Sequence, residues 1–160
     1  MNTIFYTNIT TAFGPMKIYG QKSMIHRVCF DFIETQYPTV KYWKPCDFFH
    51  KEAKAIKGFL SGDKNAIDAL CWQIPETGTD FQQKVWKQIQ GIPTGKTLSY
   101  GSLAQKIGNP RSARAVGNAC NANPFLFLVP CHRVVGHNTI GGFGWGLERK
   151  ESLLALEHKM

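Results

Sequence analysis

The stretch "LSYGSLAQKIGNPRSARAVGNACN" (98–121) predicts two short helices joined by a tight turn. Ser99 is a suitable N-cap for the first helix, which is expected to end at Gly108. Asn109 and Pro110 have the residue types of an N-cap and a first helical position, so they predict the start of the second helix. Two such helices inside a basic segment form a helix-turn-helix candidate.

The second predicted helix has two different faces. Its polar side chains at helical spacing are Arg111, Arg114 and Asn118, and its small apolar ones are Ala113, Val116 and Cys120. Alanines and Gly117 keep the helix slim enough for close approach to a partner. The alternative is an ordinary solvated surface, because many surface helices carry arginines on their outer face. The turn, the slim helix and the basic face together favour docking onto nucleic acid.

The positive charge of the chain is concentrated in its second half. The net charge is +8, of which residues 1–80 contribute +1 and residues 81–160 contribute +7. No acidic residue lies between Asp80 and Glu148. Such a field favours a polyanionic partner, and nucleic acid is the obvious one. A basic face that serves only solubility is the alternative.

The residue pattern changes where the charge changes. Apolar alternation predicts strands within 3–9, 16–20 and 25–32. Helical spacing predicts helices over 48–60, 80–90 and 147–159, and Thr79 and Gln82 have capping-box spacing before the second of these. We therefore expect an α/β (α+β) protein with a strand-rich domain over residues 1–78 and a helical, basic domain over residues 79–160.

Composition narrows the class of protein further. The chain of 160 residues is 43% hydrophobic, which is enough for a folded core. We expect no membrane span and no signal peptide, and five cysteines without a CxxC pair predict a reducing, cytoplasmic compartment.

His26–Cys29 and Cys46–His50 have zinc-like spacings. Because a strand would turn His26 and Cys29 to opposite faces, no metal is expected.

A second stretch, "PCHRVV" (130–135), sets a cysteine between a proline and two basic side chains. The preceding "FLFLV" predicts a buried strand with Cys131 at its end. Because nearby positive charge lowers the pKa of a thiol, His132 and Arg133 indicate that Cys131 is a nucleophile. The other four cysteines are expected to be structural, since most buried cysteines are inert.

A nucleophile and its base need a third group that orients the base. One stripe of the last predicted helix contains Leu147, Lys150, Leu154 and Glu157, which would turn Glu157 toward the interior. A buried carboxylate needs a partner, and His132 is the candidate. The sequence leaves open the alternative that Glu157 is solvated near the chain end.

Together these motifs resemble the O6-alkylguanine-DNA alkyltransferases, also called methylated-DNA–protein-cysteine methyltransferases. The resemblance covers the second half of the chain through "SYGSLA", "ARAVGNA", "PCHRV" and "GLERKESLLALE", in the family's order. The first half matches loosely, through "TAFGPMKIYG". The resemblance implies a ribonuclease-H-like N-terminal domain and a C-terminal winged helix-turn-helix domain that docks in the minor groove.

The function that the resemblance implies is DNA repair by direct damage reversal. An alkyl group would pass from O6 of guanine in double-stranded DNA to Cys131, irreversibly, once per molecule and without a cofactor. The target base would be flipped out of the duplex. The protein would act as a monomer, while cooperative binding and activity on O4-alkylthymine stay open.

The resemblance also assigns roles to single residues. Cys131 would accept the alkyl group, His132 would activate it through a water, and Glu157 would orient the histidine. Asn123 would be the hinge between the recognition region and the active-site loop. The implied DNA contacts are Arg114 as the finger that replaces the flipped base, Tyr100 at the target phosphate and base, and Ser99, Arg111, Ala113, Gly117, Asn118 and Arg133. The implied base pocket is Val134, Phe143, Gly144 and Trp145, where many members carry a tyrosine in place of the phenylalanine.

Three other functions deserve comparison with alkyl transfer. A thiol hydrolase that uses Cys131, His132 and Glu157 would leave the basic helix unexplained. A relative that binds damaged DNA without repairing it would lack the acceptor cysteine. A helix-turn-helix regulator would have no use for the cysteine motif.

Overall fold

The computed structural model describes residues 3–22, 24–30 and 42–160, and it has the mixed α/β composition expected from the sequence. Its contacts divide the chain into two compact units. Unit 1 comprises Met1–Leu70 and Pro124–Leu126, and unit 2 comprises Cys71–Asn123 and Phe127–Met160. The division falls between Leu70 and Cys71, ahead of the boundary expected between residues 78 and 79, and residues 124–126 of the second half belong to unit 1. No helix of the described residues has both the length and the apolarity that crossing a bilayer requires.

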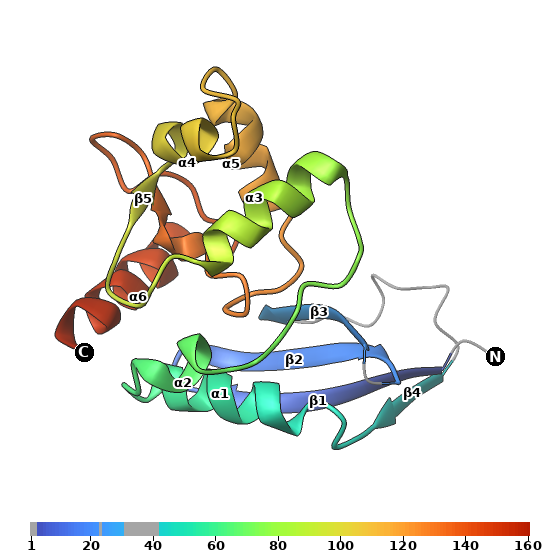
Figure 1. The fold of residues 1–160 in the computed structure, drawn as a ribbon. Coiled ribbons are helices and arrows are strands. Elements are labelled where there is room, and N and C mark those ends of the chain that lie inside the picture. The colour runs from blue at the N-terminus through green and yellow to red at the C-terminus, as the bar shows by residue number, and fades with distance from the viewer. Residues whose placement is uncertain (1–2, 23, 31–41) are drawn as a thin grey trace. The chain divides into compact units, whose positions relative to one another are not determined.

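Unit 1 is a four-stranded sheet with helices on it (Figure 1). Its strands are β1 (Thr3–Thr11), β2 (Gly14–Gln21), β3 (Met24–Phe30) and β4 (Tyr42–Pro45), in the order β3-β2-β1-β4. β1 runs antiparallel to β2 and parallel to β4. The three predicted strands are confirmed, except that Asp31 and Phe32 lie outside the described residues. This meander with a parallel fourth strand agrees with a ribonuclease-H-like sheet.

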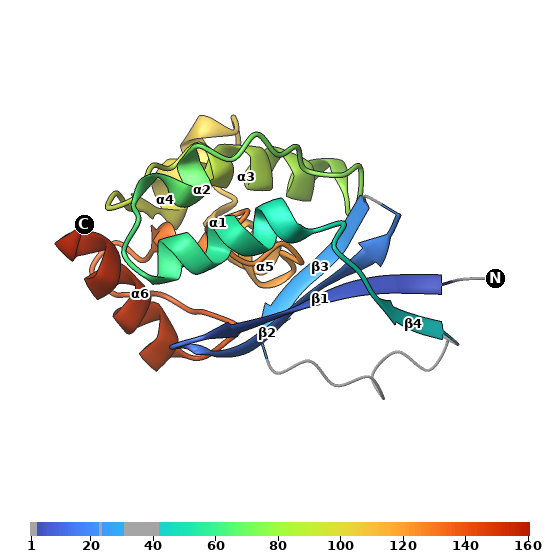
Figure 2. The same cartoon turned by 90° about the horizontal axis from the view of Figure 1, so that it is seen from below.

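Helix α1 (His50–Leu60) lies across the sheet and contacts β1, as Figure 2 shows from below. It is amphipathic, and the side chains that it buries are Ala53, Ala55, Ile56, Phe59 and Leu60. A short helix, α2 (Asn65–Asp68), follows it and packs against it. The predicted helix over 48–60 is thus confirmed to within two residues at its start.

Unit 2 is mostly helical. Its elements are α3 (Asp80–Gln90), β5 (Leu98–Ser99), α4 (Tyr100–Lys106), α5 (Ala113–Asn121), the 3-10 helix η2 (Cys131–Arg133), β6 (Val134–Val135) and α6 (Leu147–Lys159). The capping box of Thr79 and Gln82 is confirmed. Helix α3 packs on α4 and α5, and Trp86 Nε1 donates a buried hydrogen bond to the Ala119 carbonyl at 2.8 Å.

The helix-turn-helix is confirmed, although its second helix begins later than Asn109 and Pro110 predict. Ser99 caps α4, because its Oγ accepts from the Ser102 backbone N–H. The left-handed φ of +77° at Gly108 then reverses the chain. Residues 109–112 form a separate turn, in which the Ser112 N–H and Oγ both donate to the Asn109 carbonyl. Helix α5 therefore starts at Ala113.

The prediction of a strand over 125–129 is wrong, although these residues are buried as expected. Phe125 forms a bridge to Val28 that belongs to no continuous strand, and the chain turns at Phe127, whose φ is +68°. The Asn123 side chain closes this turn by donating from Nδ2 to the Val129 carbonyl at 2.8 Å. A run of apolar residues cannot distinguish a strand from a buried turn, because burial alone produces it.

Candidate active site

Cys131 is the first residue of η2, directly after this turn. Its N–H donates to the Val129 carbonyl at 2.8 Å, and the same carbonyl accepts from Asn123 Nδ2. Cys131 and Asn123 are both buried, with 9% and 7% of their surface exposed. The turn therefore holds the thiol in a fixed position at the edge of the solvent.

Behind Cys131, a buried histidine and carboxylate form a short contact. His132 Nε2 and Glu157 Oε1 are 2.5 Å apart, and both side chains are almost fully buried. The Gly95 N–H donates to Glu157 Oε2 at 2.9 Å, and the Phe127 ring packs edge-on against His132 at 5.9 Å. Glu157 therefore faces the interior, as the stripe on α6 predicts, and the solvated alternative is excluded.

The burial of this pair sets the protonation of both groups. Burial lowers the pKa of His132, and the adjacent Glu157 carboxylate only partly opposes this shift. Burial acts to raise the pKa of Glu157, but the hydrogen bond and charge of His132, the charge of Arg133 and the Gly95 N–H together hold it below its usual value. The resting pair is thus a neutral imidazole beside a carboxylate, with His132 Nδ1 as the ring nitrogen that can take up a proton.

The expectation that Arg133 contacts DNA is wrong, because its side chain is 1% exposed. Its Nε donates to Glu157 Oε1 at 3.0 Å, and its terminal nitrogens donate to the Ile92 carbonyl at 2.5 Å and to Thr94 Oγ1 at 2.8 Å. Arg133 therefore ties the segment after α3 to α6. A sequence shows that an arginine is present, but only the fold shows which way it points.

The pKa of the Cys131 thiol also differs from the expectation that its basic neighbours in sequence lower it. Burial raises the pKa of Cys131, and this effect exceeds the opposing ones, which are a hydrogen bond from Asn123, the charge of Lys150 and backbone N–H groups. His132 and Arg133, the basic neighbours in sequence, do not supply the stabilising charge, because one is neutral and the other is paired with Glu157. The nearby cation comes from α6 instead.

Tyr100 stands beside the site because β5 pairs with β6. This parallel pairing sets Leu98 opposite Val134 and Ser99 opposite Val135, so the start of α4 lies next to η2. The Tyr100 hydroxyl donates a long hydrogen bond, 3.4 Å, to the Gly142 carbonyl.

The loop after β6 is shaped to fit the Tyr100 ring. Gly141 has a φ of +71°, and a Cβ added there would lie 2.7 Å from the ring. Of the expected pocket residues, Val134 is buried, Phe143 and Trp145 are half-buried, and Gly144 is exposed. Val134 and residues 143–145 therefore follow the thiol in sequence, on either side of the loop glycine that lies against the Tyr100 ring.

The expected DNA-contacting residues of the helix-turn-helix are accessible, apart from Ser99. On α5, Arg114 and Asn118 are exposed and Val116 is buried, as the two predicted faces require. Cys120 of the predicted apolar face is half-buried, and Arg111 is exposed in the turn before the helix. Ala113 and Gly117 are half-buried between these faces. The Ser99 hydroxyl is used within the protein, since it caps α4 and bonds Ser102 Oγ.

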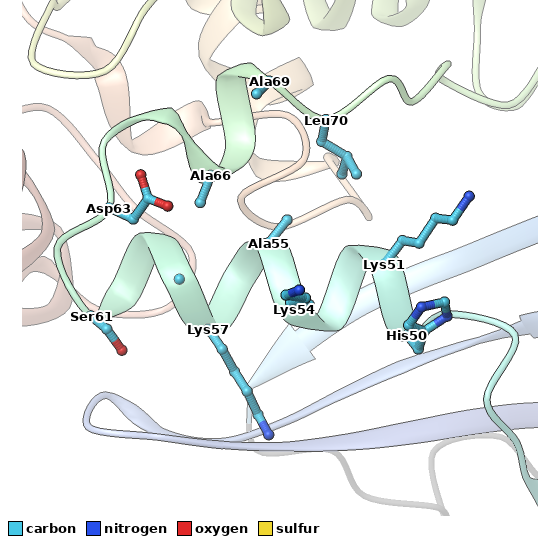
Figure 3. A pocket seen from close by; sticks show the side chains of 11 residues that line it. His50, Lys51, Lys54, Ala55, Lys57, Ser61, Asp63, Ala66, Ala69 and Leu70 are labelled. Atoms are coloured by element: carbon cyan, nitrogen blue, oxygen red, sulfur yellow. The ribbon is translucent and has the colours of Figure 1, made fainter.

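Two other features lie outside the site around Cys131. Within residues 3–22, 24–30 and 42–160, no three histidine, cysteine or acidic side chains come together as metal ligands, so the zinc-like spacings form no site there. A cavity of about 620 Å³ lies between α1 and α2 of unit 1 (Figure 3). The residues that line it lie between His50 and Leu70, and they include neither a cysteine nor His132 or Glu157.

Known proteins with the same arrangement identify the family. A family model described as "6-O-methylguanine DNA methyltransferase, DNA binding domain" matches residues 80–159. A Mycobacterium tuberculosis methylated-DNA–protein-cysteine methyltransferase is 38% identical over 157 residues, which are 96% of this chain and 92% of that protein. The chain belongs to this methyltransferase family.

Two further relatives agree with this assignment. A probable methylated-DNA–protein-cysteine methyltransferase of Acanthamoeba polyphaga mimivirus is 58% identical over 82 residues, which are 51% of this chain and 55% of the viral protein. The chain thus spans about half the length of that relative. The crystal structure of Mycobacterium tuberculosis OGT in complex with DNA superposes with a TM-score of 0.80 at 35% identity, covering 97% of this chain and 93% of that one.

The sequence did not single out every side chain of this methyltransferase that surrounds the thiol. In the sequence, Lys150 is only one member of a helical stripe, and Cys120 is only one member of an apolar face. Burial raises the pKa of Cys120 to about 12, with Cys131 and Lys150 close enough to affect it. A lysine on an otherwise inward-facing stripe was the available signal, because lysine is rarely fully buried without a partner.

Proposed function

We propose that this chain repairs DNA by moving an alkyl group from O6 of guanine to its own Cys131. The observation that carries the proposal is the thiol cluster itself: a nearly buried Cys131 followed by a His132–Glu157 pair at 2.5 Å. The same unit carries a helix-turn-helix with an exposed basic face. Membership of the methyltransferase family and the DNA complex of the Mycobacterium tuberculosis relative support both parts.

The chemistry is a displacement at saturated carbon. A bond forms between Cys131 Sγ and the alkyl carbon while the bond between that carbon and O6 breaks. The thiol proton would pass through a water to His132 Nδ1, and the imidazolium would return one proton through water to N1 of the dealkylated guanine, which stays in the DNA as the neutral base. Glu157 would stabilise the imidazolium formed in between. The product is a thioether with no route back to the thiol, so each chain would react once.

The remaining side chains would bring the base to the thiol. Because O6 of guanine faces the interior of a duplex, the target nucleotide must be flipped out. Arg114, exposed on α5, would fill the space that it leaves in the stack. Tyr100 would bond the flipped base, in a pocket formed by Val134 and the 143–145 segment. Asn123 would keep the active-site turn attached to α5.

The partner would be double-stranded DNA that contains O6-alkylguanine, and the chain would act on it as a monomer. A duplex with one O6-methylguanine is incubated with increasing amounts of protein, and its nucleosides are quantified after digestion. We expect restored guanine to rise by one per protein chain added until every lesion is repaired, and, with the duplex in excess, to stop once each chain has reacted once. Cys131→Ser should restore none, whereas Cys71→Ser, which alters an exposed cysteine, should match the wild type. Repeated turnover, or restoration by Cys131→Ser, would contradict the proposal.

A further inference from the structure

The cavity of about 620 Å³ in unit 1 has a floor of small aliphatic groups. In Figure 3, Ala55 points from α1 toward α2, and Ala66 points from α2 back toward α1. The two helices meet closely, because a Cβ added to Gly58 would lie 3.1 Å from the Ala66 Cβ. Ala69 and Leu70 complete the lining on the side of α2. A hollow of this volume is within the size range of ligand sites, and its floor suits apolar groups.

The rim of this α1–α2 groove is basic. Lys51, Lys54 and Lys57 line it from α1, and all three are exposed. Their spacing of three residues sets them about 4.5 Å apart along the helix axis. The lining contains one carboxylate, Asp63, whose Oδ1 accepts a hydrogen bond from the Asn65 N–H at 3.0 Å. No carboxylate of the described residues forms an ion pair with any of the three lysines.

This positive charge is local to the groove. Three lysines and one carboxylate give the lining a formal charge of +2, with histidine counted as neutral, whereas residues 1–80 carry +1 in total. The rest of that segment is therefore slightly acidic. The basic second half of the chain contributes nothing to the lining, because every lining residue lies between His50 and Leu70. An occupant with negative groups would thus be complementary in charge to the rim.

The residue types of the lining favour a protein segment over a nucleic acid. The described lining contains no aromatic side chain on which a base could stack, and no arginine whose planar group could bind phosphate through two donors. Lining residues extend along the whole of α1, an 11-residue helix that rises about 16 Å, so an elongated occupant fits the groove. These properties match helix-in-groove recognition, in which an amphipathic helix lays its apolar face into a groove.

We propose that the α1–α2 groove binds an acidic, amphipathic helical segment of another protein. Apolar side chains of that segment would lie on the aliphatic floor, and its carboxylates would face Lys51 and Lys54. Both kinds of contact are needed, because ion pairs at an exposed rim contribute little affinity by themselves. The groove shares no residue with the thiol site or the helix-turn-helix. It would therefore recruit a partner without taking part in methyl transfer.

A synthetic peptide tests this proposal on the full chain. The peptide is end-capped, about 15 residues long, and carries leucines along one helical face and glutamates elsewhere. Its binding is followed by the NMR shifts of the protein's backbone amides. One companion peptide has glutamine in place of every glutamate, and another has serine in place of every leucine. Undamaged duplex DNA and vesicles that contain phosphatidylglycerol are tested in parallel.

Single charge reversals on the protein complete the test. Lys51→Glu and Lys54→Glu alter the rim, whereas Lys57 extends away from α2 in Figure 3 and is left unchanged. Lys51→Glu places a carboxylate in the first turn of α1, where negative charge is favourable, so this variant should fold. Lys44→Glu is the matched control, because Lys44 is exposed on β4 and does not line the groove.

We expect the acidic leucine peptide to shift amides of residues 50–70 to saturation, and both companion peptides to bind at least about tenfold more weakly. Lys51→Glu and Lys54→Glu should each weaken binding about threefold or more, and Lys44→Glu should stay near the wild type. All three variants should restore guanine as the wild type does, so failure of the proposed function is distinguishable from failure of this inference. Absence of shifts, shifts confined to α5, or unchanged affinity in both rim variants would overturn the proposal. Shifts of residues 50–70 by DNA or vesicles but not by the peptide would also overturn it, and would assign the groove to nucleic acid or lipid.

Discussion

Replacing Glu157 by Gln tests the buried relay most sharply. The carboxylate accepts hydrogen bonds from Gly95 N–H and Arg133 Nε and contacts His132 Nε2. Glutamine has nearly the same shape, so it leaves no cavity. It has one acceptor oxygen in place of two, and it has no charge to compensate Arg133 or to stabilise an imidazolium. The substitution therefore isolates the effect of the charge.

The structure allows the size of both effects to be stated. Removing one partner of a buried ion pair costs about 3–5 kcal/mol, and solvent screening does not reduce this at 3% exposure. Because glutamine keeps one acceptor, we expect the free energy of unfolding to fall by about 3 kcal/mol. Loss of the group that orients a general base should slow methyl transfer about 100-fold. Affinity for undamaged duplex DNA should stay within about twofold, since Glu157 is remote from the exposed face of α5.

Three measurements check these expectations. Urea denaturation gives the free energy of unfolding, single-turnover kinetics with an O6-methylguanine duplex give the transfer rate, and fluorescence anisotropy gives DNA affinity. Glu151→Gln is the matched control, because Glu151 is exposed on the same helix and should behave as the wild type. An unchanged transfer rate in folded Glu157→Gln would remove this carboxylate from the relay. A loss of stability below about 1 kcal/mol would contradict the buried ion pair.

Other expected outcomes concern pH, the pocket loop and the DNA face. Because burial lowers the folded-state pKa of His132, the unfolded chain binds a proton first on acidification, so the free energy of unfolding should fall as the pH drops through about 6.5, and His132→Gln should flatten this part of the urea-denaturation profile. A pH profile of the same slope in His132→Gln would contradict the assignment. Gly141→Ala should slow methyl transfer at least about tenfold, since a positive φ costs an alanine about 1–2 kcal/mol and its Cβ would meet the Tyr100 ring, whereas Gly142→Ala has open space and should be neutral. Equal rates in the two glycine variants would count against the role of the loop. Arg114→Ala should reduce transfer from duplex DNA far more than transfer from free O6-benzylguanine, with both reactions followed by the mass of the peptide that carries Cys131. Equal losses would exclude a role in holding the flipped base.

The sequence predicted the features that local residue chemistry determines. The capping box at Thr79, the cap at Ser99 and the two faces of α5 follow from side-chain types at fixed spacings, and the structure confirms them. The inward turn of Glu157 was predictable in the same way, from a helical stripe. These features can be predicted because they depend on residues that are close in sequence, and not on which segments of the chain pack together.

Features that depend on packing between distant segments were not predictable. Residues 125–129 form a turn because Asn123 and Val28 supply partners that no local pattern reveals. Arg133 points inward because Glu157, 24 residues away, accepts its hydrogen bonds. For the same reason the cation beside Cys131 is a lysine from α6, and not one of the basic neighbours in sequence.

The location of the transferred group tests the central claim most directly. The protein is incubated with a duplex that contains O6-methylguanine, and its peptides are then weighed. We predict a gain of one methyl group on the peptide that carries Cys131, which saturates at one group per chain and leaves the Cys120 peptide unchanged. A methyl group on Cys120, or no gain on any peptide while the lesion disappears, would contradict the account.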